Sequence, residues 1–304
     1  MKIGTNDITD LKIGTTEINE VRLGSVLVWE RVSAVFLLDL YPAAIAYSIR
    51  KLSTTATVCI RVRRSSDNAE TDIGFIGNDL DTASLLSFVG AGNGFVTTWY
   101  DQSGNSLNIS RVVLSQQPRI VSLGVVDSKG LKPSISFDGS DDILAYPSPI
   151  VALNSGSQFS IFNVHHSNLL NTIRTFWATV SSGSANQMRG FGDTRNVASP
   201  INFFVNNSGG TGFNATLSTT RNNTDQRLQV SVMDSGNVMR GFDNGATGGT
   251  PTYTGTYANS IFQIGNGANG ALNGGAQEFI IFDTNQLANR TAIETNINDY
   301  YGIY

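Results

Sequence analysis

The feature that most constrains the fold is a two-residue alternation of apolar and polar side chains that recurs along most of the chain. It is clearest at residues 134–137, 159–164, 226–233 and 279–282. Clusters of glycine, asparagine and serine separate such segments at short intervals, which is typical of antiparallel strands joined by turns. Strands that alternated with long helices would instead indicate a parallel sheet. The sequence therefore predicts an all-β fold in which two antiparallel sheets form a sandwich.

Three segments carry helical periodicity instead, at residues 42–52, 82–88 and 286–301. The second is preceded by Asp81 at the position of an N-cap. The third places Ile293, Ile297 and Tyr300 along one face. We therefore expect a few short helices beside the sheets.

The composition suits one large domain and argues against several functional classes. The chain has 304 residues, of which 40% are hydrophobic and 14% are charged, which is enough apolar material for a large core. The net charge is −4 and the basic residues are spread along the chain, so we expect no nucleic-acid partner. The only cysteine, Cys59, lies in an apolar run, which favours a core position.

The beginning MKIGTNDITD lacks the apolar stretch of a signal peptide, and no run approaches the ~20 apolar residues that span a bilayer. We therefore expect a protein made in the cytoplasm, without a membrane partner.

The first thirty residues form a repeat. In units of ten they read KIGTNDITDL, KIGTTEINEV and RLGSVLVWER. Each unit begins with a basic residue, an aliphatic residue and glycine, and this pattern predicts short strands joined by tight turns. Three strands of roughly five residues bury little surface alone, so they need a packing partner. We expect a separate segment at residues 1–32, either an attachment module or a small β-meander, ahead of a sandwich domain at residues 33–304.

This repeat, with its closing Val-Trp-Glu strand, is similar to the N-terminal segments of structural proteins from tailed bacteriophages. The resemblance implies a virion protein, made in the cytoplasm of a bacterial host, whose residues 1–32 bind other virion proteins. Head fibre, capsid decoration and tail fibre all remain open. Analogy with phage fibres implies a homotrimer.

Four segments of the main domain resemble the catalytic domain of fungal α-L-arabinofuranosidase B, a concanavalin-like jelly roll. They are IRVRRSSDNAETDIGF, FVTTWYDQSGNS, SISFDGSDDIL and GNGANGALNGGAQEFIIF, in this order along the chain. The FDGSDD segment is also similar to laminin-G and legume-lectin-like domains. The resemblance covers most of residues 34–304 and implies a concanavalin-like two-sheet sandwich that binds or cleaves carbohydrate.

The catalytic carboxyl groups of that family do not carry over. A retaining glycosidase needs two carboxyl groups about 5–5.5 Å apart. The family's nucleophilic Glu follows a His-Met pair, where this chain has Gln187, Met188 and Arg189. The family's acid/base Asp falls on Gly267, beside Asn266. Because a guanidinium group cannot attack an anomeric carbon, the sequence predicts no arabinofuranosidase-type hydrolysis.

Three functions remain for the sandwich. The first is non-catalytic binding of host or environmental glycans, strengthened by many copies on one particle. Its candidate ligand residues are Trp177, Asn186, Gln187, Arg189, Asn266 and Asn269. The alternative is a virion-borne polysaccharide depolymerase with a rearranged carboxylate pair, such as Asp193 and Glu278. The third is a structural lattice protein without a ligand.

The turn YDQSG at residues 100–104 is carried over intact although the catalytic pair is not. Asp and Ser side chains commonly bond backbone amides in turns, so we expect a structural network here. Its expected members are Arg63, Arg64, Asp67, Tyr100, Asp101, Gln102 and Ser103.

Two further groups resemble metal sites only loosely. The aspartates of FDGSDD, namely Asp138, Asp141 and Asp142, offer the oxygen ligands that Ca²⁺ takes, but their spacing does not match the twelve-residue calcium loop. His165 and His166 have no cysteine or carboxylate at a metal-ligand interval, so we expect exposed histidines at a strand end. The sequence therefore predicts no cofactor, with Ca²⁺ at the three aspartates as the alternative.

Overall fold

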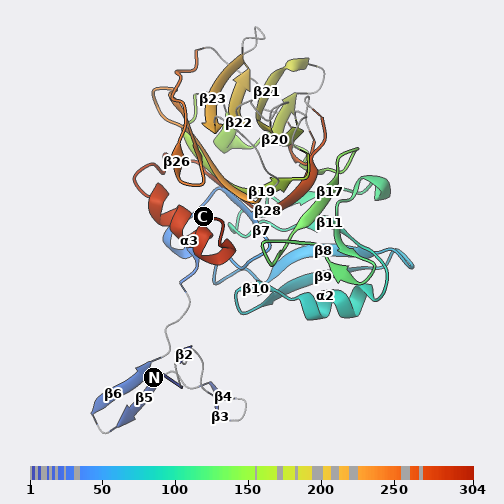
Figure 1. The fold of residues 1–304 in the computed structure, drawn as a ribbon, viewed down its shortest axis with the longest axis vertical. Helices are drawn as coiled ribbons and strands as arrows, with labels where there is room; N and C mark the ends of the chain where they lie inside the picture. Colours follow the sequence, from blue (N-terminus) through green and yellow to red (C-terminus); the bar gives the residue numbers. More distant parts are fainter. Residues whose placement is uncertain are drawn as a thin grey trace. The chain divides into compact units, whose positions relative to one another are not determined.

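The computed structural model describes two units of the chain (Figure 1). Contacts divide the chain into Met1–Phe36 and Leu37–Tyr304. The described residues are 35–154, 156–169, 174–181, 184–193, 201–206, 212–218, 225–254, 261–266 and 270–304, with short strands within residues 1–30.

The first unit contains three short antiparallel hairpins, one around the position of the first glycine in each unit of the sequence repeat. They are β1 (Lys2–Ile3) with β2 (Asn6–Asp7), β3 (Lys12–Ile13) with β4 (Thr16–Glu17), and β5 (Glu20–Leu23) with β6 (Val26–Glu30). In each hairpin a glycine and a hydroxyl residue separate the strands in sequence, a composition that favours two-residue hairpin loops. The repeat therefore forms three pairs of strands and not the three single strands predicted.

The second unit is an antiparallel two-sheet sandwich, as predicted. In spatial order, the first sheet contains β10 (Asp79–Leu80), β9 (Glu70–Ile76), β8 (Val58–Arg64), β11 (Gly94–Trp99), β12 (Ile109–Ser110), β18 (Leu144–Tyr146), β27 (Ile261–Ile264), β20 (Arg174–Ser181), β21 (Ser184–Asp193), β22 (Ile201–Asn206) and β23 (Gly212–Ser218). The second contains β26 (Ala246–Thr247), β25 (Met239–Asp243), β24 (Arg227–Met233), β19 (Phe159–Ser167) and β28 (Asn273–Phe282), with β7 (Ile45–Ser48) and β17 (Ile135–Asp138) on different halves of β28. β13 (Arg119–Ser122) pairs with both β11 and β17 and so connects the two sheets.

Aromatic side chains from both sheets meet in the core. The ring of Phe279 in β28 lies 5.3 Å from that of Phe262 in β27 and 5.6 Å from that of Trp177 in β20. Tyr47 of β7 lies 5.8 Å from Trp99 of β11. All five side chains are fully buried, and burying a large apolar side chain contributes about 1.5–3 kcal/mol. This aromatic layer holds the two sheets face to face.

Two of the three predicted helices are confirmed. α2 (Thr82–Val89) begins after Asp81, whose carboxylate accepts a hydrogen bond from the backbone N–H of Ser84 at 2.9 Å. α3 (Arg290–Tyr301) lies against β28, where the hydroxyl of Tyr301 donates to the carbonyl of Gln277 at 3.1 Å, and it buries Ile293 and Ile297. No helix among the described residues is long and apolar enough to cross a membrane.

The helix predicted at residues 42–52 is wrong. A short helix, α1 (Leu37–Leu40), ends before this segment, and the segment itself contains β7. All four residues of β7 are buried and pair with β28. Pairing with a central strand therefore overrides the helical spacing of the local sequence.

Candidate functional site

The turn after β11 is closed by the side chain of Asp101. One carboxylate oxygen accepts the backbone N–H groups of Ala46 and Ser103, both at 2.9 Å. The other accepts the N–H of Leu107 at 3.1 Å and the hydroxyl of Ser103 at 2.8 Å. A single carboxylate thus fixes the loop up to Leu107 and attaches it to β7.

Gln102 strengthens this attachment from a buried position. Its amide nitrogen donates to the carbonyls of Ser48 at 2.9 Å and Arg50 at 3.0 Å, and its amide oxygen accepts from the N–H of Leu52 at 2.8 Å. The hydroxyl of Ser103 also donates to the carbonyl of Ala44. The turn therefore holds the chain on both sides of β7.

The side chains of the other expected members of this network have other partners. The Arg63 guanidinium donates to Gln117 at 2.6 Å, and Arg64 forms an exposed ion pair with Asp67 at 2.7 Å. Tyr100 donates to Asp72 at 2.8 Å. Arg63 and Arg64 pair with Phe95 and Gly94 at the start of β11, whereas the turn follows the other end of that strand. The length of β11 thus separates Arg63 and Arg64 from Asp101.

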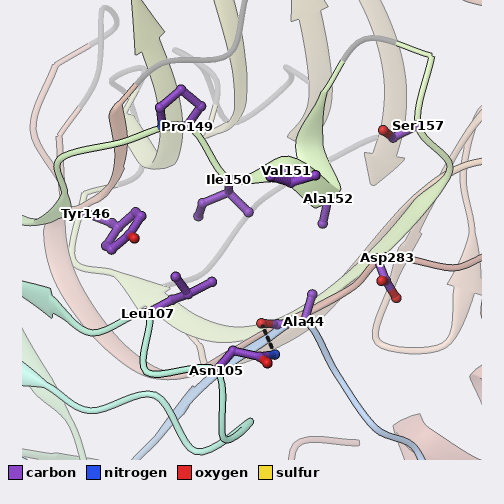
Figure 2. A pocket seen from close by; sticks show the side chains of 10 residues that line it. All are labelled: Ala44, Asn105, Leu107, Tyr146, Pro149, Ile150, Val151, Ala152, Ser157 and Asp283. Atoms are coloured by element: carbon purple, nitrogen blue, oxygen red, sulfur yellow. Dashed lines mark hydrogen bonds between the residues drawn. The ribbon is translucent and has the colours of Figure 1, made fainter.

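Beside this turn lies a pocket of about 410 Å³ (Figure 2). The turn contributes Asn105 and Leu107, β18 contributes Tyr146, and the segment between β18 and β19 contributes Pro149 to Ala152 and Ser157. Ala44, before β7, and Asp283, after β28, complete the lining. Pockets that bind small ligands usually measure roughly 300–1,000 Å³, so this one has the size for a sugar ring.

The lining of the pocket contains both apolar and polar side chains. Figure 2 shows Tyr146, Leu107 and Ile150 on one side and the carboxylate of Asp283 on the other. Ile150 is buried, and the backbone of Leu107 is held by Asp101 and by the hydroxyl of Tyr47. Leu107 and Ile150 are therefore held in fixed positions in the lining.

Asn105 forms part of the polar edge of the pocket. Its amide nitrogen donates to the carbonyl of Ala44 at 3.0 Å, the dashed line in Figure 2. Its backbone N–H donates to the hydroxyl of Ser103 at 3.2 Å. Both bonds depend on the turn that Asp101 closes, so this turn supports the fold and also positions a pocket residue.

Of the sugar-binding residues predicted from the sequence, the two whose side chains are described, Trp177 and Asn266, do not line this pocket. Trp177 is wrong as a ligand residue, because its buried ring packs against Phe262 and Phe279. Asn266 follows β27 and is half-buried, and its carbonyl accepts from the Gln263 amide at 2.7 Å.

The remaining predicted ligand residues lie outside the described side chains. Asn186, Gln187 and Arg189 belong to β21, for which the strand register is described, and Arg189 pairs there with Thr179 of β20. Asn269 and Gly267 lie outside the described residues altogether.

Glu278 cannot belong to the catalytic pair considered in the sequence. It is fully buried and accepts hydrogen bonds from the Arg50 guanidinium at 2.8 and 3.0 Å and from the Ser48 hydroxyl at 2.7 Å. It follows Gln277 and precedes Phe279, whose ring lies in the core, so Glu278 lies on the opposite face of β28, under α3. Its carboxylate stabilises the packing of α3. The side chain of Asp193, the other member of the pair, lies outside the described residues.

The three aspartates of FDGSDD do come together. Their carboxylate oxygens lie within 4.8 Å of one another, so Asp138, Asp141 and Asp142 are the residues that could hold a cation. Burial, together with the charges of Asp138 and Asp141, raises the pKa of Asp142 to about 6. Backbone N–H groups occupy part of the cluster, because Asp142 accepts from Asp138 at 2.9 Å and Asp138 accepts from Ser140 at 2.7 Å. These bonds are those of a self-contained turn.

The two histidines are buried, so the expectation of exposed histidines is wrong. The imidazole of His165 stacks on Phe176 with ring centroids 4.3 Å apart and shares a 2.8 Å hydrogen bond with Asn163. The side chain of His166 is packed against Gly275, where an added Cβ would lie 2.5 Å from the imidazole. Both residues belong to β19, which is buried along its whole length.

Comparison with solved structures identifies the fold. No protein-family model and no curated protein matches the sequence. The structure is similar to a GH54 α-L-arabinofuranosidase soaked with a cyclic sulfate inhibitor, with a TM-score of 0.66 and 14% identity over 86% of this chain. It is also similar to an arabinofuranosidase complexed with arabinofuranosyl-α-1,2-xylobiose, with a TM-score of 0.63 and 13% identity over 86% of this chain. This chain spans 65% and 64% of the lengths of those two proteins. The protein therefore has the two-sheet sandwich fold of these arabinofuranosidases, as the sequence predicted.

Proposed function

We propose that this protein binds carbohydrate without cleaving it, in the pocket of Figure 2. The observation that carries the proposal is the combination of the Tyr146 ring, the anchored carboxamide of Asn105 and the carboxylate of Asp283 around one hollow. The C–H face of a sugar packs on an aromatic ring, and its hydroxyl groups form strong hydrogen bonds with a carboxylate. The similarity to sugar-cleaving enzymes agrees with a carbohydrate ligand.

The lining of the pocket also supports binding over cleavage. Glycoside hydrolysis commonly uses two carboxyl groups, one on each side of the scissile bond. Within the described part of the chain, Asp283 is the only residue of the pocket lining that has a carboxyl group. A single carboxylate can orient a sugar, but it cannot serve as both nucleophile and acid.

A glycan array probed with the full chain, clustered on beads to raise avidity, tests the binding. We expect captured glycans, at least tenfold weaker binding after Asp283→Ala, and unchanged binding after Asp299→Ala, which removes an exposed carboxylate from α3. An array that stays blank at high valency would favour the structural lattice protein. Release of reducing ends from a bound polysaccharide would favour the depolymerase.

We further propose that the protein belongs to the virion of a tailed bacteriophage, is made in the bacterial cytoplasm, and assembles as a homotrimer through residues 1–32. Support comes from the resemblance of the repeat and from its division into three hairpins. An isolated two-stranded hairpin is marginally stable in water, so such a segment gains stability from a partner. Light scattering should give the full chain three times its 32.6 kDa mass, and a monomer would contradict the trimer.

A further inference from the structure

We infer that the pocket of Figure 2 selects N-acetylated amino sugars over unsubstituted and acidic sugars. The inference rests on the proposed function and adds a ligand class to it. It follows from two features of the described lining: an aliphatic surface, and a single charge, which is negative.

The aliphatic surface comes mainly from Leu107, Pro149 and Val151, with the buried Ile150 behind them. A plain hexose or pentose carries a hydroxyl group on nearly every carbon, so it would press hydroxyl groups against this surface. Burying a hydroxyl group without a hydrogen bond is costly. An acetamido group instead offers a methyl group, which gains from apolar burial. The aliphatic surface therefore favours a sugar that carries a methyl group.

The carboxylate of Asp283 suits the N–H of the acetamido group. Figure 2 shows the carboxylate of Asp283 across the pocket from Leu107 and Tyr146. An acetamido group has an N–H donor, and hydrogen bonds from N–H groups to a carboxylate are among the stronger ones. A sugar whose ring packs on Tyr146 can thus direct its N–H toward Asp283 and its methyl group toward the aliphatic residues of the lining.

The charge of the lining selects against acidic sugars. Among the described residues that line the pocket, Asp283 is the only charged one, and none is a lysine, arginine or histidine. A uronic or sialic acid would bring a second carboxylate near Asp283 with no cation to compensate it. Repulsion of this kind is a common source of specificity.

Competition measurements on the full chain test the inference. The probes are N-acetylglucosamine and N-acetylgalactosamine, each compared with its parent hexose, its free amine and its uronic acid, as competitors for an immobilised glycan that the protein binds. One well-placed methyl group is worth roughly tenfold or more in discrimination. We therefore expect at least one acetamido sugar to compete at a concentration at least tenfold lower than its parent hexose and its uronic acid.

Two matched variants locate the preference. Val151 is 77% exposed and lines the pocket, whereas Val125 is 68% exposed and belongs to β14 (Val125–Val126), outside the lining. Val151→Ser should reduce the preference for the acetamido sugar severalfold, and Val125→Ser should leave it unchanged. Equal competition by the acetamido sugar and its parent hexose, or stronger competition by a uronic acid, would overturn the inference and leave carbohydrate binding intact. Failure of the full chain to bind any glycan would overturn both.

Discussion

The surroundings of Asp142 disfavour its negative charge. It is 7% exposed, and burial is the main cause that raises its pKa to about 6. The nearby charges of Asp138 and Asp141 act in the same direction, while the N–H of Asp138 and the Arg119 guanidinium oppose them. The native state thus holds the Asp142 proton more tightly than the unfolded chain, in which an aspartate titrates near 4. This contribution to stability is present below pH 4 and is lost as the pH rises through 6.

The substitution Asp142→Asn tests whether this buried charge destabilises the protein. Asparagine cannot ionise, and its amide oxygen can still accept the N–H of Asp138. The variant should exceed the natural protein in free energy of unfolding by about 1–3 kcal/mol at pH 7.5, and by much less near pH 4. Urea unfolding at the two pH values measures this difference. Equal effects at both pH values would show that the charge of Asp142 is not the cause.

Single residues also show what the sequence could not decide. Cys59 is buried, as its apolar neighbours predict. Trp177 and Tyr146 both lie on strands, yet the first is buried in the core and the second lines the pocket. The alternation along a strand shows on which face of the sheet a side chain lies. Whether other parts of the chain cover that face depends on segments that are distant in the sequence. The ligand role assigned to Trp177 failed for this reason.

At the scale of elements, β7, β28 and α3 are joined by one buried ion pair. Arg50, just after β7, holds Glu278 of β28 through two hydrogen bonds, and the hydroxyl of Tyr301 in α3 donates to the same carboxylate at 3.2 Å. Both charged groups are nearly inaccessible to water. Removing one partner of a buried pair leaves the other charge uncompensated, which costs more than losing an exposed pair.

We therefore expect Glu278→Gln to lower the free energy of unfolding by about 3–5 kcal/mol. The matched control is Asp72→Asn, which breaks the exposed pair between Arg61 and Asp72 and should cost about 1 kcal/mol or less. Calorimetry or denaturant unfolding of the two variants makes the comparison. Similar costs for both would contradict a structural role for Glu278 under α3.

The elements that the sequence predicted correctly are those with strong local signals. α2 has an N-cap at Asp81, and the four alternating segments all contain strands. Residues 42–52 have helical spacing but form β7, because pairing with β28 decides their conformation. Such pairing joins residues more than two hundred positions apart, which a local pattern cannot reveal.

For the whole molecule, the order of sequence segments was enough to predict the sandwich but not the pocket. The pocket combines Ala44, Asn105, Tyr146 and Asp283, which lie far apart in the chain and become neighbours only when the strand ends meet. The only local signal was the turn at residues 100–104, which positions Asn105 without identifying its partners. A candidate site of this kind requires the three-dimensional structure.

The division of the chain leads to a prediction about the whole molecule. Every member of the described hydrophobic core lies at Leu37 or beyond, and contacts divide the chain at the same point. A chain that begins at Leu37 should therefore unfold cooperatively at nearly the melting temperature of the sandwich in the full protein, and it should bind the same glycans. Because it lacks the three hairpins, it should be a monomer in light scattering while the full chain is a trimer. A truncated chain that fails to fold would show that residues 1–36 belong to the folding unit. A truncated chain that remains trimeric would place the assembly contacts on the sandwich instead of the hairpins.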